Sequence, residues 1–161
     1  MRKATHVLAT LLTLALGIGT AGTARAETAM GAVFGYPGNV GFSLRLDQIP
    51  MAAAFSSDLL HGTVDRWLIK KAMKDGDGKL SWYFGPGADI GIPIEDNVDF
   101  FLAGRAPVGL QLMWKPKIEF FGEFAPGIQI VNDLEFYYAF SVGVRWVVGE
   151  KKGPASSPRV N

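Results

Sequence analysis

The chain has 161 residues, of which 48% are hydrophobic and 19% are charged, with a formal net charge of +1 and no cysteine. This length suits a single domain, and the high hydrophobic content excludes a disordered protein. The lack of cysteine excludes disulfide bridges and cysteine-based zinc sites. A charge close to zero gives no indication of a nucleic-acid partner.

The first 26 residues have the pattern of a secretory signal peptide. Arg2 and Lys3 precede an apolar run from Val7 to Ile18, and the segment closes on Ala24-Arg25-Ala26, an A-x-A cleavage site. Thr and Gly interrupt the apolar run, which argues against an uncleaved membrane anchor. We therefore expect residues 1–26 to be removed on export.

Turn-forming residues divide residues 27–148 into segments with a hydrophobic period of two, which is typical of all-β barrels and sandwiches. Pro86, Pro107 and Pro126 fall inside such segments and indicate bulges or unpaired positions, because proline lacks the N–H of a strand ladder. The polar residues 149–161 are predicted to form a disordered tail. The predicted strands are 29–36, 40–47, 50–56, 61–72, 80–91, 98–114, 117–131 and 136–148.

The last three predicted strands have a bulky apolar face and a small or polar face. The even positions of 102–114, 118–130 and 136–148 hold no charged residue. An eight-stranded barrel is only just wide enough to be filled by side chains, so the bulky face must point outward. An outward apolar face suits lipid and opposes solubility in water. We expect an all-β fold, an eight-stranded antiparallel up-and-down transmembrane β-barrel, rather than a soluble lipocalin-like barrel.

This orientation predicts two groups of residues. Large aromatic residues at strand ends that share one rim indicate an aromatic girdle, formed by Trp82, Trp114, Phe120 and Trp146. Charges on inward positions of a narrow barrel are costly unless they are paired. We therefore expect an interior charge network that plugs the lumen, with a small conducting or proton-passing path as the alternative. The predicted network contains Arg45, Asp65, Asp89, Arg105, Glu119, Glu123 and Arg145.

Three segments resemble an uncharacterised family of small outer-membrane β-barrels akin to OmpA/OmpX-type proteins. They are Gly35-Tyr36-Pro37-Gly38-Asn39-Val40-Gly41, Gly104-Arg105-Ala106-Pro107-Val108-Gly109-Leu110 and Phe121-Gly122-Glu123-Phe124-Ala125-Pro126. The last predicted strand, with Ser141, Gly143, Trp146 and Val148, resembles the signal that the barrel-assembly machinery reads. Such signals usually end the protein, whereas residues 149–161 follow here.

His61 is the one histidine that follows the signal segment, and the pattern places it in a loop over residues 56–62, near Ser56, Ser57 and Asp58. A histidine with a serine and a carboxylate can form a hydrolytic site, which makes a lipid-modifying hydrolase the enzymatic alternative. The simpler interpretation is a solvated loop histidine. Asp75-Gly76-Asp77-Gly78 lacks the later ligands of a calcium loop and is better explained as a hairpin turn.

These observations predict a small monomeric protein of the outer membrane of a Gram-negative-type bacterium, exported by its signal peptide. Its expected partners are outer-membrane lipid and, during biogenesis, the barrel-assembly machinery. We expect no catalytic residues, no metal and no cofactor, and a structural or interfacial role. The alternatives are the lipid-modifying hydrolase and a soluble periplasmic ligand-binding barrel.

Overall fold

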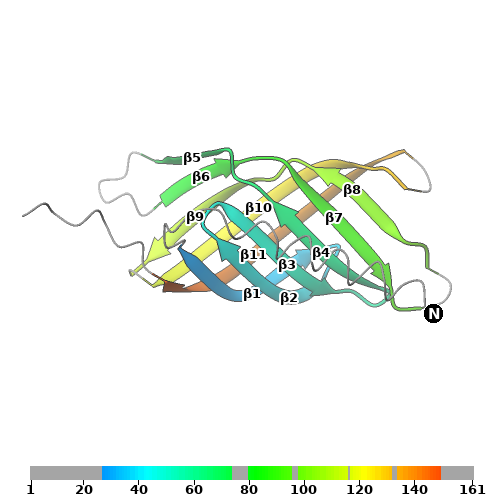
Figure 1. The fold of residues 1–161 in the computed structure, drawn as a ribbon, viewed down its shortest axis with the longest axis horizontal. Coiled ribbons are helices and arrows are strands. Elements are labelled where there is room, and N and C mark those ends of the chain that lie inside the picture. Colours follow the sequence, from blue (N-terminus) through cyan, green and yellow to red (C-terminus); the bar gives the residue numbers. More distant parts are fainter. Residues whose placement is uncertain (1–26, 74–79, 96–97, 116, 132–133, 150–161) are drawn as a thin grey trace, which may run out of the picture.

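The computed structural model describes residues 27–73, 80–95, 98–115, 117–131 and 134–149, and within them it has strands and no helix. All strands belong to one antiparallel sheet, so the all-β prediction is confirmed. Figure 1 shows the strands inclined to the long axis of the molecule. The predicted signal peptide, the Asp75-Gly76-Asp77-Gly78 turn and residues 150–161 lie outside the described residues.

The predicted strands 61–72, 80–91 and 98–114 are each divided in two, which corrects the expected count of eight elements. Pro86 and Pro107 lie in the interruptions, as their missing N–H predicts. Pro126 instead lies within a continuous strand, where it pairs with Tyr138 and has no ladder partner on its other side. Hydrogen bonds from Arg66 N to Pro86 O at 2.9 Å and from Gly85 N to Pro107 O at 3.2 Å connect neighbouring interruptions. The strands are β1 (Thr28–Tyr36), β2 (Val40–Leu46), β3 (Ile49–Phe55), β4 (Leu59–Asp65), β5 (Ile69–Ala72), β6 (Leu80–Phe84), β7 (Gly87–Pro93), β8 (Phe101–Arg105), β9 (Val108–Trp114), β10 (Ile118–Gln129) and β11 (Glu135–Gly149).

Eight of the strands form a closed ring of antiparallel pairings. The order is β11-β1-β2-β3-β4-β7-β8-β10, and β10 pairs back to β11. The strands β9, β6 and β5 extend the sheet lengthwise beyond β8, β7 and β4, because β9 pairs with the same edge of β10 as β8, β6 pairs with β9, and β5 pairs with β6. Since β5 pairs only with β6 among the described residues, its other edge is open.

Side chains alternate between an exposed apolar face and a buried face, as the pattern in the last predicted strands indicates. On β10 and β11, Phe124, Phe140 and Trp146 are 48%, 54% and 55% exposed, whereas Glu119 and Arg145 are 0% and 3% exposed. Arg45 on β2 contacts Glu119 on β10, although these strands are not neighbours in the ring. The buried face is therefore the inner face of the ring.

Small residues allow close packing on and between the strands. A Cβ atom at Gly31 on β1 would lie 1.9 Å from the backbone oxygen of Val144 on β11. At Gly143 it would lie 2.4 Å from the ring of Phe121, which packs inside. These two glycines are required by the close approach of β1, β10 and β11.

Candidate functional site

One buried ion cluster connects β2, β10 and β11. Glu119 accepts hydrogen bonds from Arg45 Nε at 3.0 Å, from Arg45 Nη2 at 2.7 Å and from Arg145 Nη1 at 2.7 Å. Arg145 Nε also donates to Ser43 Oγ at 2.8 Å, and Arg45 forms an ion pair with the partly exposed Glu27. A single carboxylate therefore bridges two guanidinium groups inside the ring.

A second ion cluster is centred on Arg105 at the end of β8. Its Nε and Nη2 atoms donate to the two carboxylate oxygens of Asp65, both at 2.8 Å. Nη2 also donates to Glu123, whose other oxygen accepts from Tyr83 Oη at 3.0 Å. The bidentate geometry fixes the orientation of both planar groups and strengthens the pairing.

Asp89 belongs to a third polar group, which adjoins the second because Asp89 and Tyr137 both interact with Arg105. It accepts a hydrogen bond from Tyr137 Oη on β11, and its Oδ1 lies 3.3 Å from His61 Nδ1. Phe101 packs against both His61 and Tyr137, with ring centroids 5.9 Å and 5.0 Å away. The structure thus places all seven residues of the predicted charge network on the inner face, divided among three groups.

The predicted location of His61 in a solvated loop is wrong. His61 lies in β4 and is 4% exposed. The turn ends earlier than expected because Ser56 Oγ accepts from Leu59 N at 3.0 Å and donates to Leu59 O at 3.0 Å. The hydroxyl of Ser56 therefore serves the turn, and the expected grouping of His61 with Ser56, Ser57 and Asp58 is not formed.

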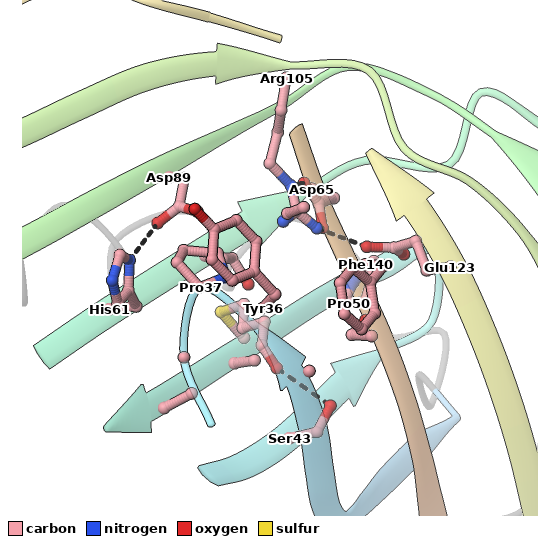
Figure 2. A pocket seen from close by; sticks show the side chains of 18 of the residues that line it. Tyr36, Pro37, Ser43, Pro50, His61, Asp65, Asp89, Arg105, Glu123 and Phe140 are labelled. Atoms are coloured by element: carbon pink, nitrogen blue, oxygen red, sulfur yellow. Dashed lines mark hydrogen bonds and ion pairs between the residues drawn. The ribbon is translucent and has the colours of Figure 1, made fainter. Parts of the chain in front are cut away.

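A small cavity separates the groups on the inner face. Its volume is about 50 Å³, and because one water needs roughly 10–15 Å³, about three to five waters fit. Figure 2 shows His61 and Asp89 on one side and Asp65, Arg105 and Glu123 on the other. His61 Nε2 is buried and has no hydrogen-bond partner among the described residues. Leaving such an atom unsatisfied costs about 1–3 kcal/mol.

The four residues predicted to form an aromatic girdle lie on the exposed side of the sheet in two separate places. The rings of Trp114 and Phe120 are 6.0 Å apart, and Trp114 and Trp146 both pair with Ile118 from opposite sides. Trp82 is half-buried on β6, where it pairs with Leu110 on β9.

The residues of the predicted assembly signal all lie in β11. Ser141 and Gly143 are half-buried, whereas Trp146 and Val148 are 55% and 61% exposed. The predicted tail begins one residue too early, because Gly149 is the last residue of β11 and pairs with Thr28.

Trp67 is an inner residue that the sequence analysis did not single out. It is 1% exposed, stacks on Tyr83 at 4.2 Å and has Arg45 and Lys70 over its ring at 5.6 Å and 5.1 Å. It lies in the interruption between β4 and β5, where its backbone N–H donates to Gln48 O at 2.8 Å. Its odd residue number places it on the inner face by the alternation of the pattern, but the small and polar character of that face did not predict a bulky side chain there.

Comparison with protein-family models, with curated proteins and with solved structures found no match to this chain. Within the described residues, no helix is long and apolar enough to cross a membrane. Nor do three or more acidic or histidine side chains in this part of the chain gather in a way that could hold a metal ion. The fold and the inner polar groups are therefore the basis for a functional proposal.

Proposed function

We propose that this chain is a small integral outer-membrane β-barrel protein with a structural or interfacial role, whose lumen is plugged by charged side chains. The observation that carries the proposal is the reversal of the usual distribution of residues. Phe140 and Trp146 are more than half exposed, while Arg45, Glu119 and Arg145 are buried. Such a distribution suits a lipid solvent outside and a polar interior.

The size of the exposed apolar face supports a membrane location. Among the residues that the structure describes, thirty large hydrophobic side chains are 37% exposed or more. Burying one such side chain fully contributes about 1.5–3 kcal/mol. Covering the exposed half of each would therefore contribute roughly 20–45 kcal/mol, against a typical folding stability of about 5–15 kcal/mol. The closed ring also fits, because a spanning sheet in lipid must pair its backbone groups.

The interior supports a plug rather than a pore. The long side chains of Arg45, Arg105 and Arg145 are buried on the inner face of the ring. All three are held by hydrogen bonds to carboxylates, so they are fixed in place. The stacked rings of Trp67 and Tyr83 fill more of the same space.

The two alternatives have less support. A hydrolase would need a hydroxyl nucleophile at His61 Nε2, and that atom has no partner within the described residues. A soluble lipocalin-like barrel would need its apolar face inside, whereas the inner face here carries the charges. Export by residues 1–26 and recognition of β11 by the barrel-assembly machinery remain part of the proposal.

Membrane fractionation and electrophoresis test the proposal. The protein should be found in the outer-membrane fraction, resist extraction by alkali or high salt, and require detergent for release. A closed barrel resists unfolding by detergent, so the unheated sample should migrate differently from the boiled sample. A protein found in the soluble periplasmic fraction, or one with no heat-dependent shift after detergent extraction, would overturn the assignment.

A further inference from the structure

We infer that the open edge of β5 is a docking site for an extended acidic segment of another protein, which adds to the sheet as a further strand. The inference rests on one rim of the ring and is independent of the proposed membrane location. Three features support it, namely backbone groups that face away from β6, the position of the edge beyond β3, and the positive charge beside it.

The backbone groups of Lys70 and Ala72 face away from β6. In an antiparallel pair, alternate residues exchange hydrogen bonds with the partner strand, and the residues between them point the other way. Met73 N donates to Leu80 O at 2.9 Å in the register of this pair, so the odd-numbered residues of β5 bond to β6. The N–H and C=O groups of Lys70 and Ala72 have no backbone partner in the described part of the chain. Such a row of groups is a template for an added strand.

The open edge begins where the turn between β2 and β3 ends the neighbouring wall. Trp67 N donates to Gln48 O at 2.8 Å, and Gln48 lies in that turn, so β3 provides no partner for the residues of β5. All residues of β5 are exposed, and the strand lies at the margin of the sheet in Figure 1. A segment that pairs with Lys70 and Ala72 would therefore lie in line with β3 and extend the wall beyond the turn.

The side chains beside this edge are basic. Lys70 and Lys71 lie in β5 and Arg66 precedes it, and all three are exposed. None of them forms an ion pair within the described residues. Lys70 pairs with the buried Tyr83 and Lys71 with Trp82, so the two lysines point to opposite faces. Carboxylates at two adjacent positions of an added strand would therefore each meet one lysine.

The same charges argue against the other occupants of the edge. A second copy of β5 would bring the lysines of the two copies together, and like charges across a strand pair are destabilising. Residues 1–26 hold three basic residues and no acidic one, and residues 150–161 hold three basic residues and one acidic one, so neither terminal segment complements the edge. Asp47, in the turn between β2 and β3, offsets one of the three positive charges and leaves two.

NMR and amide hydrogen exchange of the folded, ¹⁵N-labelled full chain in uncharged detergent micelles test the inference. The probe is a blocked hexapeptide with two adjacent glutamates flanked by valine and threonine. One control peptide has glutamine in place of both glutamates, and the other keeps the glutamates but is N-methylated at every backbone nitrogen. We expect the acidic peptide to shift the Lys70 and Ala72 amide resonances saturably and to slow their exchange about tenfold, and each control to bind about tenfold more weakly.

Four results would overturn the inference. The first is no shift with the acidic peptide, and the second is equal binding of either control peptide. The third is slow exchange of the Lys70 and Ala72 amides before any peptide is added, because a terminal segment or a second copy would then cover the edge. The fourth is the same shift and protection with phosphatidylglycerol in the micelles, because the lysines would then bind a lipid headgroup.

Variants connect the binding to the edge of β5. Ala72→Pro removes an N–H that faces away from β6, a position where an edge strand tolerates proline, and should weaken binding about tenfold. Lys71→Glu should weaken binding of the acidic peptide and favour a peptide with lysines in place of the glutamates. Lys117→Glu, in the exposed turn between β9 and β10, is the matched control and should leave binding unchanged. If Ala72→Pro does not fold, the charge exchange at Lys71 decides, and unchanged binding in either folded β5 variant would refute the site.

Discussion

Replacing Glu119 by alanine should destabilise the protein more than any other single change to an acidic side chain. Glu119 is fully buried and accepts three charge-assisted hydrogen bonds, two from Arg45 and one from Arg145. Its removal leaves two guanidinium groups on the inner face without their shared carboxylate. The penalty of an uncompensated buried charge then adds to the loss of the bonds.

The magnitude follows from the contacts that remain. Hydrogen bonds to charged groups contribute about 1.5–3 kcal/mol each, so three would give roughly 4.5–9 kcal/mol as an upper bound. Arg45 keeps Glu27 and Arg145 keeps Ser43, which lowers the loss. We therefore expect a decrease of about 3–5 kcal/mol in the free energy of unfolding for Glu119→Ala. Glu119→Gln, which retains one acceptor oxygen, should lose less.

Urea unfolding in lipid vesicles measures this difference, with tryptophan fluorescence and the heat-dependent electrophoretic shift as the two signals. Glu95→Ala is the matched control, because Glu95 is exposed and should change stability by no more than about 0.5 kcal/mol. A surface ion pair contributes up to about 1 kcal/mol. If Glu119→Ala lowers the free energy of unfolding by less than this, Glu119 does not hold the two arginines in place.

Three further predictions concern strand packing, the exposed face and the second ion cluster. Gly31→Ala should prevent β1 from pairing with β11 and reduce the folded fraction in the electrophoretic assay, whereas Gly62→Ala, whose Cβ meets only one oxygen at 3.9 Å, should fold normally. If the exposed face meets lipid, Phe140→Arg should lower the free energy of unfolding in lipid vesicles by about 2–4 kcal/mol. Ser57→Arg, in an exposed turn, should leave it unchanged. Equal urea midpoints for the two variants would contradict a lipid-facing Phe140. Arg105→Lys should lower the free energy of unfolding by about 1–3 kcal/mol, because lysine cannot form the bidentate pair with Asp65. An unchanged urea midpoint would show that the bidentate geometry adds no stability.

The face of each residue in β10 and β11 could be predicted from the sequence because the alternation there is regular. Phe124 and Phe140 occupy even positions and are exposed, and Glu119 and Arg145 occupy odd positions and are buried. A strand has a side-chain period of two, so one correct assignment of the bulky face determines every other position on the same strand.

The grouping of the inner residues could not be predicted in the same way. Parity places Asp89 and Arg105 on one face, but it does not say that Asp89 pairs with His61 and Tyr137 instead of an arginine. Those contacts depend on the tilt of the strands and on which of them face each other across the ring. Trp67 was missed for a related reason, because it lies where the chain leaves the regular alternation between β4 and β5.

The ladders around the ring differ greatly in length, and this determines which pair of strands separates first. β3 pairs with β4 only over Met51–Phe55, whereas β10 pairs with β11 over the whole of Ile118–Gln129. The short ladder between β10 and β8 is continued along the same edge by β9. Beyond Asp65 the chain continues into β5, which has no ladder to β3 in the described structure. Separation of neighbouring strands would therefore begin between β3 and β4, and not between β1 and β11, where the first strand pairs with the last.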